Sequence, residues 1–156
     1  MSVEVRTVRE AKLRVQVVDQ RTSFDNDPDL FANNSQDKQD QLQKKVVQAQ
    51  KLLQEVKIDE DLRLRISAIC GELDVDGLRG DIVTNRASRA LAAFEGRKDV
   101  TEEDIARVVS TALRHRLRKD PLEQVDSGDR VIKAYCKIFE RNESNDAREF
   151  ELATKN

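Results

Sequence analysis

The sequence predicts an all-α fold, and three observations support this prediction. Charged residues make up 37% of the 156 residues and aromatic residues only 4%, without any tryptophan, a composition typical of solvated helices. Apolar residues recur every three to four positions over most of the chain. Alternation typical of a strand occurs only at residues 3–5. We therefore expect a four-helix bundle, preceded by an extended helical hairpin and a short N-terminal strand.

Residues 7–57 are expected to form the helical hairpin. The run from Thr7 to Glu10 fits a capping box, and it opens an apolar stripe that includes Val8, Ala11, Val15 and Val18. The segment 25–29 contains Pro28 and should break this helix. Ser35 is the expected cap of a second, long polar helix. Its narrow apolar seam, Leu42, Val46, Ala49, Leu53 and Val56, indicates one antiparallel neighbour.

Residues 58–140 are expected to form the bundle. Asp59 should cap its first helix, Thr101 and Asp104 should cap the third, and Gly96 should end the second. The break at 120–121 and the turn at 127–128 separate the third helix from the fourth. The expected inward residues are Leu62, Ile66, Ile69, Cys70 and Leu73; Ile82, Val83, Ala87, Ala90, Leu91 and Phe94; Ile105, Val108, Val109, Ala112, Leu113 and Leu117; and Val131, Ile132, Tyr135, Ile138 and Phe139.

The two ends of the chain do not fit the bundle. A strand at residues 3–5 has no partner in the sequence and cannot satisfy its backbone groups alone. Residues 1–6 are therefore expected to be the end of a larger domain from which the chain was cut. Residues 141–156 are polar and are expected to be a disordered or cloning-derived tail.

Composition argues against several classes of protein. Lys and Arg number 28 against 30 Asp and Glu, a net charge of −2, which gives no general reason to expect nucleic acid. No stretch has the length of a membrane span. Cys70 and Cys136 lie in apolar stripes and are expected to be buried, reduced thiols.

Catalytic and metal-binding motifs are missing from the sequence. It contains no glycine-rich phosphate loop. His115 is the single histidine, so that neither a Cys/His metal cluster nor a Ser-His-Asp triad can be proposed. The spacing of Asp74, Asp76 and Asp81 departs from that of a calcium loop. The chain by itself is therefore expected to be non-catalytic and to hold no metal.

The most informative segment runs from Asp76 to Arg86. Gly77 and Gly80 are expected to let the backbone bend there, and a helix should begin directly afterwards. A helix N-terminus favours anions, and Arg79 adds a donor suited to phosphate oxygens. The alternative is that Arg79 only pairs with Asp76 or Asp81 on the surface.

A second basic cluster, Arg114, Arg116, Arg118 and Lys119, surrounds His115. On a continuous helix Arg114 and Arg118 would share a face. Cations at the end of a helix are favoured by its dipole. The other interpretations are a subunit contact, an acidic partner or, less well supported, nucleic acid.

Residues 72–86, 90–97 and 113–123 closely resemble the ATPase subunit, subunit I, of magnesium chelatase, and the segments 2–6 and 24–28 fit the same family in order. The resemblance covers residues 2–139. It implies the C-terminal helical lid of an AAA+ motor that drives insertion of Mg²⁺ into protoporphyrin IX, an ATP-dependent ligase of chlorophyll and bacteriochlorophyll synthesis. In such a protein the ATP and Mg²⁺ would be bound mainly by the ATPase core that precedes the lid.

The resemblance also assigns residues and partners. Gly77-Leu78-Arg79 matches the sensor-2 pattern, in which the arginine reaches the terminal phosphates of ATP. Arg86 is expected to support Arg79 or to lie at a ring interface, and Arg114, Arg116 and Arg118 are possible interface residues. The implied partners are the ATPase core, a homo-oligomeric ring and chelatase subunits D and H, in a chloroplast stroma or a phototroph cytoplasm.

Two alternatives remain at this stage. A stand-alone helical adaptor or assembly protein would use residues 35–56 as a docking surface and bind no nucleotide. The lid of a MoxR-type AAA+ chaperone would share the same plan of helices. The run 113–123 favours the chelatase.

Overall fold

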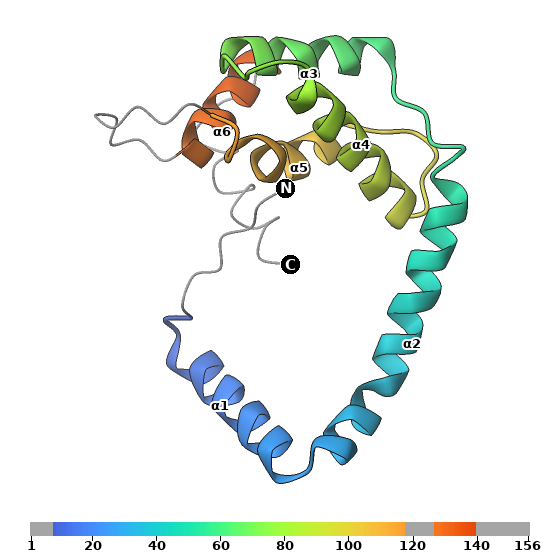
Figure 1. Cartoon of the computed structure of the whole chain (residues 1–156), viewed down its shortest axis with the longest axis vertical. Coiled ribbons are helices and arrows are strands. Elements are labelled where there is room, and N and C mark those ends of the chain that lie inside the picture. The colour runs from blue at the N-terminus through green and yellow to red at the C-terminus, as the bar shows by residue number, and fades with distance from the viewer. Residues whose placement is uncertain (1–7, 118–126, 140–156) are drawn as a thin grey trace. The chain divides into compact units, whose positions relative to one another are not determined.

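The computed structural model of the chain describes residues 8–117 and 127–139. This part is helical and contains no named strand, which confirms the predicted all-α class. The helices are α1 (Ala11–Asn26), α2 (Pro28–Leu52), α3 (Glu60–Glu72), α4 (Arg79–Phe94), α5 (Glu102–Leu113) and α6 (Ser127–Ile138) (Figure 1). The predicted strand at 3–5 and the predicted tail at 141–156 lie outside the described residues. Residues 48–117 and 127–139 belong to one compact unit and residues 8–47 to another.

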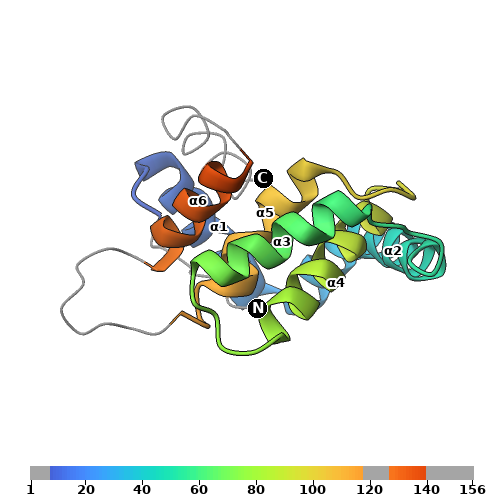
Figure 2. The same cartoon turned by 90° about the horizontal axis from the view of Figure 1, so that it is seen from above.

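Helices α3 to α6 form the expected four-helix bundle (Figures 1 and 2). α3 packs on α4 and α6, and α5 packs on the same two helices, so that the four surround one core. The predicted inward residues of α3, α5 and α6 lie in this core. The completely enclosed members include Ile69, Ile105, Val109, Leu113, Val131 and Tyr135. Large aliphatic side chains buried in this way supply most of the stabilisation of a small domain.

Helix α4 differs from its neighbours because it buries small side chains. Its buried residues are Gly80, Thr84, Ser88, Ala92 and Ala93. The first four recur at four-residue intervals and therefore form one stripe along the helix. Such a stripe lets the α4 backbone approach its neighbours closely. The predicted inward face of α4 is wrong in part, since Ile82 is 47% exposed and Ala90 is also exposed.

The ends of α3 and α4 have the same termination motif. At the end of α3 the Val75 N–H donates to the Cys70 carbonyl, and the residue between helix and turn, Asp74, has φ 49°. At the end of α4 the Arg97 N–H donates to the Ala92 carbonyl, and Gly96 has φ 78°. These are Schellman motifs. The predicted stop at Gly96 is confirmed, and Asp74 holds the corresponding position after α3.

The connector between α2 and α3 is fastened to the bundle by backbone and side-chain bonds. The Lys57 N–H donates to the Lys98 carbonyl over 2.7 Å, and the Val100 N–H donates to the Lys57 carbonyl over 3.0 Å. Arg89 on α4 donates to the carbonyl groups of Val56 (3.0 Å) and Leu53 (3.2 Å). The guanidinium therefore binds two carbonyl groups of the residues that follow α2, which no longer belong to the helix.

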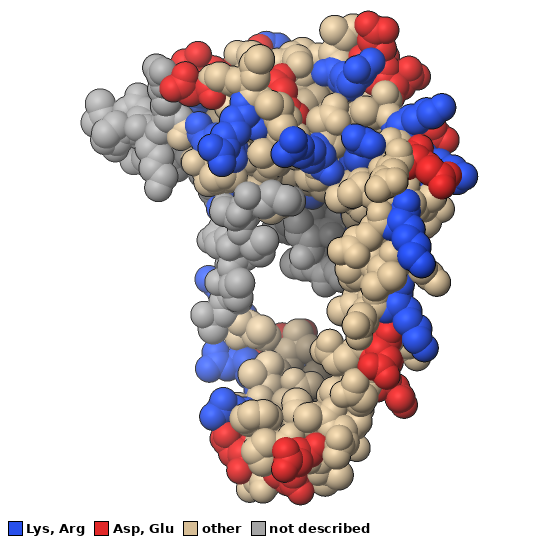
Figure 3. Space-filling model, turned by 45° about the vertical axis from the view of Figure 1, so that its right-hand side comes forward, with Lys and Arg blue, Asp and Glu red and all other residues tan. Residues whose placement is uncertain are grey.

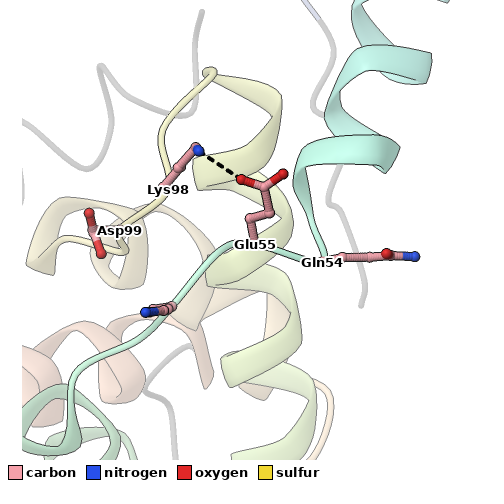
Figure 4. Close-up of a pocket in the computed structure, with 5 residues that line it drawn as sticks. Gln54, Glu55, Lys98 and Asp99 are labelled. Carbon is pink, nitrogen blue, oxygen red and sulfur yellow. Dashed lines mark ion pairs between the residues drawn. The ribbon is translucent and has the colours of Figure 1, made fainter.

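An open depression lies beside this connector. It is lined by Gln54, Glu55, Lys57, Lys98 and Asp99 (Figure 4). The Lys98 ammonium and the Glu55 carboxylate are 2.7 Å apart. Their hydrogen bond and mutual attraction lower the pKa of Glu55 and raise the pKa of Lys98. Both groups are solvent-exposed, so the pair contributes little to stability, and the depression holds no arrangement suited to chemistry.

The N-terminal unit departs from the prediction in two details. The predicted break after α1 is confirmed, but Pro28 is the first residue of α2, so the predicted start at Ser35 is wrong. The Asp27 carboxylate accepts the Leu30 N–H over 2.9 Å and thereby caps α2, and proline suits the first helical position because its missing N–H would have no partner there. At the start of α1 the cap is Glu10, without a side-chain hydrogen bond.

Side chains of α1 and α2 meet at their joint. The rings of Phe24 and Phe31 contact edge to face, with centroids 5.7 Å apart. From the joint the two helices diverge (Figure 1), and they are not among the pairs of helices that pack extensively on each other. Neither helix has a buried residue.

Candidate functional site

The turn between α3 and α4 places Arg79 at the first position of α4. Gly77 adopts φ 65°, a conformation that favours glycine, and this confirms its predicted part in the bend. Gly80 is different, because its φ is not in the left-handed region and it lies inside the first helical turn. The prediction that Gly80 serves the bend is therefore wrong. Its buried position indicates a packing reason instead.

Arg79 is exposed and has no hydrogen bond or ion pair in the described part of the chain. The alternative pairing with Asp76 or Asp81 is thus absent. The Asp81 carboxylate instead accepts the Ser67 hydroxyl of α3 over 2.6 Å. Arg79 and Asp81 are two residues apart on a helix and do not face each other. The guanidinium is therefore available to an anion from outside the bundle.

The surroundings of Arg79 combine the N-terminus of a helix with exposed apolar side chains. The first N–H groups of α4 carry the positive end of the helix dipole. Leu78 is 75% exposed and Ile82, one turn later, is also exposed. Arg86 lies two turns beyond Arg79 on the same face and is exposed. Exposed apolar groups beside two unpaired arginines are typical of a contact surface.

Comparisons with known proteins show what the chain as a whole is similar to. An AAA lid domain model matches residues 63–134. Over 139 residues, 89% of the chain, the sequence is 60% identical to magnesium-chelatase subunit ChlI of Anabaena variabilis. It is 59% identical over the same length to that of Synechocystis, and 54% identical to that of Chlorella vulgaris. The chain is therefore similar to magnesium-chelatase subunit ChlI over about nine tenths of its own length. It spans 41%, 39% and 39% of the length of these three relatives.

The second basic cluster does not lie on a continuous helix. α5 ends at Leu113, and the Arg116 N–H donates to the Leu113 carbonyl in the turn that follows. The prediction that α5 continues to Asp120 is therefore wrong in the described residues, and Arg118 lies outside them. Arg114 is half-buried and has interaction partners. The Nε atom of Arg116 is buried without a hydrogen-bond partner.

Charge on the visible face of the molecule is mixed. In Figure 3 the blue groups of Lys and Arg are separated by tan and red atoms.

Within residues 8–117 and 127–139, no group of three or more His, Cys, Asp or Glu side chains could hold a metal ion. None of the helices in the same ranges combines the length and the apolarity of a membrane span.

Cys70 of α3 lies directly beneath the start of α4. Burial, together with the nearby Asp81 carboxylate, raises the pKa of the Cys70 thiol to about 12. The thiolate is the reactive form, so Cys70 is a packed thiol of low reactivity. Cys136 is also buried.

We expect both thiols to react slowly with a disulfide reagent in the native protein. The rise in the pKa of Cys70 from 9.0 to about 12 corresponds to roughly a thousandfold less thiolate near pH 8. The measurement is the time course at pH 8 over which the reagent releases its own thiol on reaction with the protein, with and without denaturant. Two thiols should react promptly after denaturation, and one that reacts in the native state as fast as free cysteine would contradict this account.

Sequence reasoning missed an ion-pair network between the end of α4 and the start of α5. Asp104 is 1% exposed, and its two carboxylate oxygens accept Arg97 over 2.8 and 2.5 Å. Glu95 joins the network by accepting Arg97 over 2.6 Å and by an ion pair with Arg107. Asp104 was predicted as part of the capping box with Thr101, which is confirmed. The pairing with Arg97 carries no sequence signal, because both partners are ordinary residues of a loop and a helix start.

Proposed function

We propose that this chain is the lid of an AAA+ motor subunit that couples ATP hydrolysis to insertion of Mg²⁺ into protoporphyrin IX. The ATP and Mg²⁺ would be bound mainly by an ATPase core in the full-length subunit. The lid would add Arg79 as the sensor of the terminal phosphates. The observation that carries the proposal is an exposed arginine without a partner at the first position of α4, in a chain similar to magnesium-chelatase subunit ChlI.

The chemistry assigned to Arg79 is electrostatic. A guanidinium forms charge-assisted hydrogen bonds to phosphate oxygens. Such a bond would join lid and core while the γ-phosphate is present and would be lost on hydrolysis, so that hydrolysis changes the angle of the lid. No group in this segment is assigned a proton or a nucleophile, and the segment alone is proposed to be non-catalytic.

The proposed partners follow from the same similarity. The subunit would act as a homo-oligomeric ring together with chelatase subunits D and H, in the cytoplasm of a phototroph or in a chloroplast stroma. Arg86, on the face of Arg79, and Arg114 and Arg116, in the turn after α5, are the residues proposed for contacts between subunits, with Arg118 beyond them in the sequence.

The test is a reconstituted reaction. The full-length subunit is mixed with subunits D and H, protoporphyrin IX, Mg²⁺ and ATP, and formation of the Mg²⁺ porphyrin is followed by its fluorescence. We expect formation that requires both the subunit and ATP. A subunit that binds its partners but supports no insertion, with or without ATP, would overturn the proposal and favour an adaptor.

A further inference from the structure

We propose that Gly80 is a positioning residue for Arg79, because the absence of a side chain at position 80 fixes where the first turn of α4 lies. This inference rests on the proposed function of Arg79 as a phosphate sensor. It concerns a residue that neither contacts the nucleotide nor serves the bend before α4.

Gly80 is surrounded on three sides. A Cβ atom built at this position would lie 2.9 Å from Val75 Cγ1, 3.2 Å from Cys70 Sγ and 3.2 Å from Leu113 Cδ2. Real Cβ atoms essentially never show a contact as short as the first, and the other two distances are tighter than nine in ten real Cβ contacts. The three atoms belong to the turn, to α3 and to α5, so no single movement of one neighbour would make room.

The three neighbours are themselves held in place. Val75 is half-buried, and its backbone is tied to the end of α3 by the hydrogen bond from its N–H to the Cys70 carbonyl, 3.0 Å long. Cys70 is 5% exposed and Leu113 is completely buried in the core. In a close-packed interior an added methyl group forces side chains or backbone to shift. A shift of the α4 backbone at Gly80 would move the neighbouring residue, Arg79, with it.

Local conformation gives no reason for glycine at this position. Gly80 lies inside a helix and has no positive φ. Alanine is favoured over glycine in a helix interior. Space is therefore the reason for glycine here, and the close approach that it permits sets the position of the residue before it, Arg79.

A second contact holds the same turn from the other side. The residue after Gly80, Asp81, accepts the Ser67 hydroxyl of α3 over 2.6 Å. The first turn of α4, which begins at Arg79, is therefore packed against α3 and α5 at Gly80 and hydrogen-bonded to α3 at Asp81. A contact between a guanidinium and a phosphate depends steeply on placement, since a misplacement of about 1 Å can cost roughly 100-fold in rate.

The experiment compares Gly80→Ala with Gly71→Ala in the full-length subunit. Gly71 lies at the end of α3, without positive φ, and a Cβ there would meet nothing within 4 Å. For Gly80→Ala we expect a roughly tenfold higher KM for ATP in the ATPase assay, an unchanged affinity for ADP and a far-UV spectrum that still shows a folded helical protein. For Gly71→Ala we expect no change in KM.

A second-site change tests whether placement is the cause. Val75→Ala removes the atom nearest to the added methyl group, and therefore the KM of Gly80→Ala/Val75→Ala should lie between those of Val75→Ala and Gly80→Ala. Where Gly80→Ala alone does not fold, a double variant with the same KM as Val75→Ala overturns the inference. If Gly80→Ala folds and has the wild-type KM for ATP, while Arg79→Ala has a higher KM, the inference about Gly80 is overturned and the proposed function of Arg79 is not. An unchanged KM in Arg79→Ala overturns the proposed function as well.

Discussion

Replacing Arg79 with alanine in the full-length subunit should lower the ATP-dependent rate of Mg²⁺ insertion by roughly 10- to 100-fold. A hydrogen bond to a charged group contributes about 1.5–3 kcal/mol, and each 1.4 kcal/mol corresponds to about a tenfold change. The fold should be unaffected, because Arg79 is exposed and has no partner in the described part of the chain. The rate is measured as porphyrin fluorescence, with the Tm as the measure of folding.

Two matched variants show whether the loss is specific. Arg63 is an exposed arginine on α3 whose side chain also has no partner among the described residues, and Arg63→Ala should leave the rate within about twofold because it removes the same charge elsewhere. Arg79→Lys keeps the charge but loses the planar fork, so its rate should lie between those of Arg79→Ala and the wild type. A normal rate in Arg79→Ala would refute the assignment.

Arg97→Ala is expected to be the most destabilising of the changes discussed here, with a loss of about 3 kcal/mol in the free energy of unfolding at pH 7. It leaves the buried Asp104 carboxylate without the guanidinium that now binds both of its oxygens. In the wild type, burial would raise the pKa of Asp104, but the hydrogen bonds from Arg97 and Thr101 together lower it. Without Arg97 the effect of burial should dominate.

The pH dependence of the difference in stability follows from the lowered pKa of Asp104 in the wild type and its raised pKa in Arg97→Ala. In the wild type the lowered pKa of Asp104 stabilises the fold above the unfolded-state value of about 3.9, and this stabilisation is lost as the pH falls further. In Arg97→Ala the raised pKa favours the neutral acid in the folded state. The difference in stability between the two proteins should therefore shrink as the pH is lowered from 7 towards 4.

Urea unfolding of both proteins between pH 4 and 7 measures this difference. Lys98→Ala is the control, since it breaks the solvent-exposed pair with Glu55 and should cost less than about 1 kcal/mol. Equal losses in Arg97→Ala and Lys98→Ala, or a loss for Arg97→Ala that does not depend on pH, would show that the buried pair is not formed.

The sequence predicts α3, α5 and α6 well because their core residues are large and aliphatic. Ile66 and Ile69 of α3 and Val131 of α6 recur at helical spacing, and hydrophobic periodicity identifies such faces directly. For α4 the same rule selects Ile82, which is exposed. Its buried stripe begins at Gly80 and consists of small residues. Small residues are needed there because the helices lie close together, and the spacing of apolar residues in the sequence does not give the distance between helices.

The candidate site could be predicted only in part for a similar reason. The sequence places Arg79 at a helix start, and this is confirmed. That Asp81 bonds to Ser67, fourteen positions away, is a property of the folded chain. The start of α2 at Pro28 could have been predicted from the sequence, because proline is favoured at the first position of a helix as well as at a break.

The most direct test of the central claim, that Arg79 senses the γ-phosphate, is the ratio of the affinities of the full-length subunit for ATP and ADP. It is measured by calorimetry on the wild type and on Arg79→Ala. We expect Arg79→Ala to weaken ATP binding by roughly tenfold or more and to leave ADP binding within about twofold, which lowers the ratio. An unchanged ratio, whether because neither nucleotide is affected or because both weaken equally, would contradict the claim.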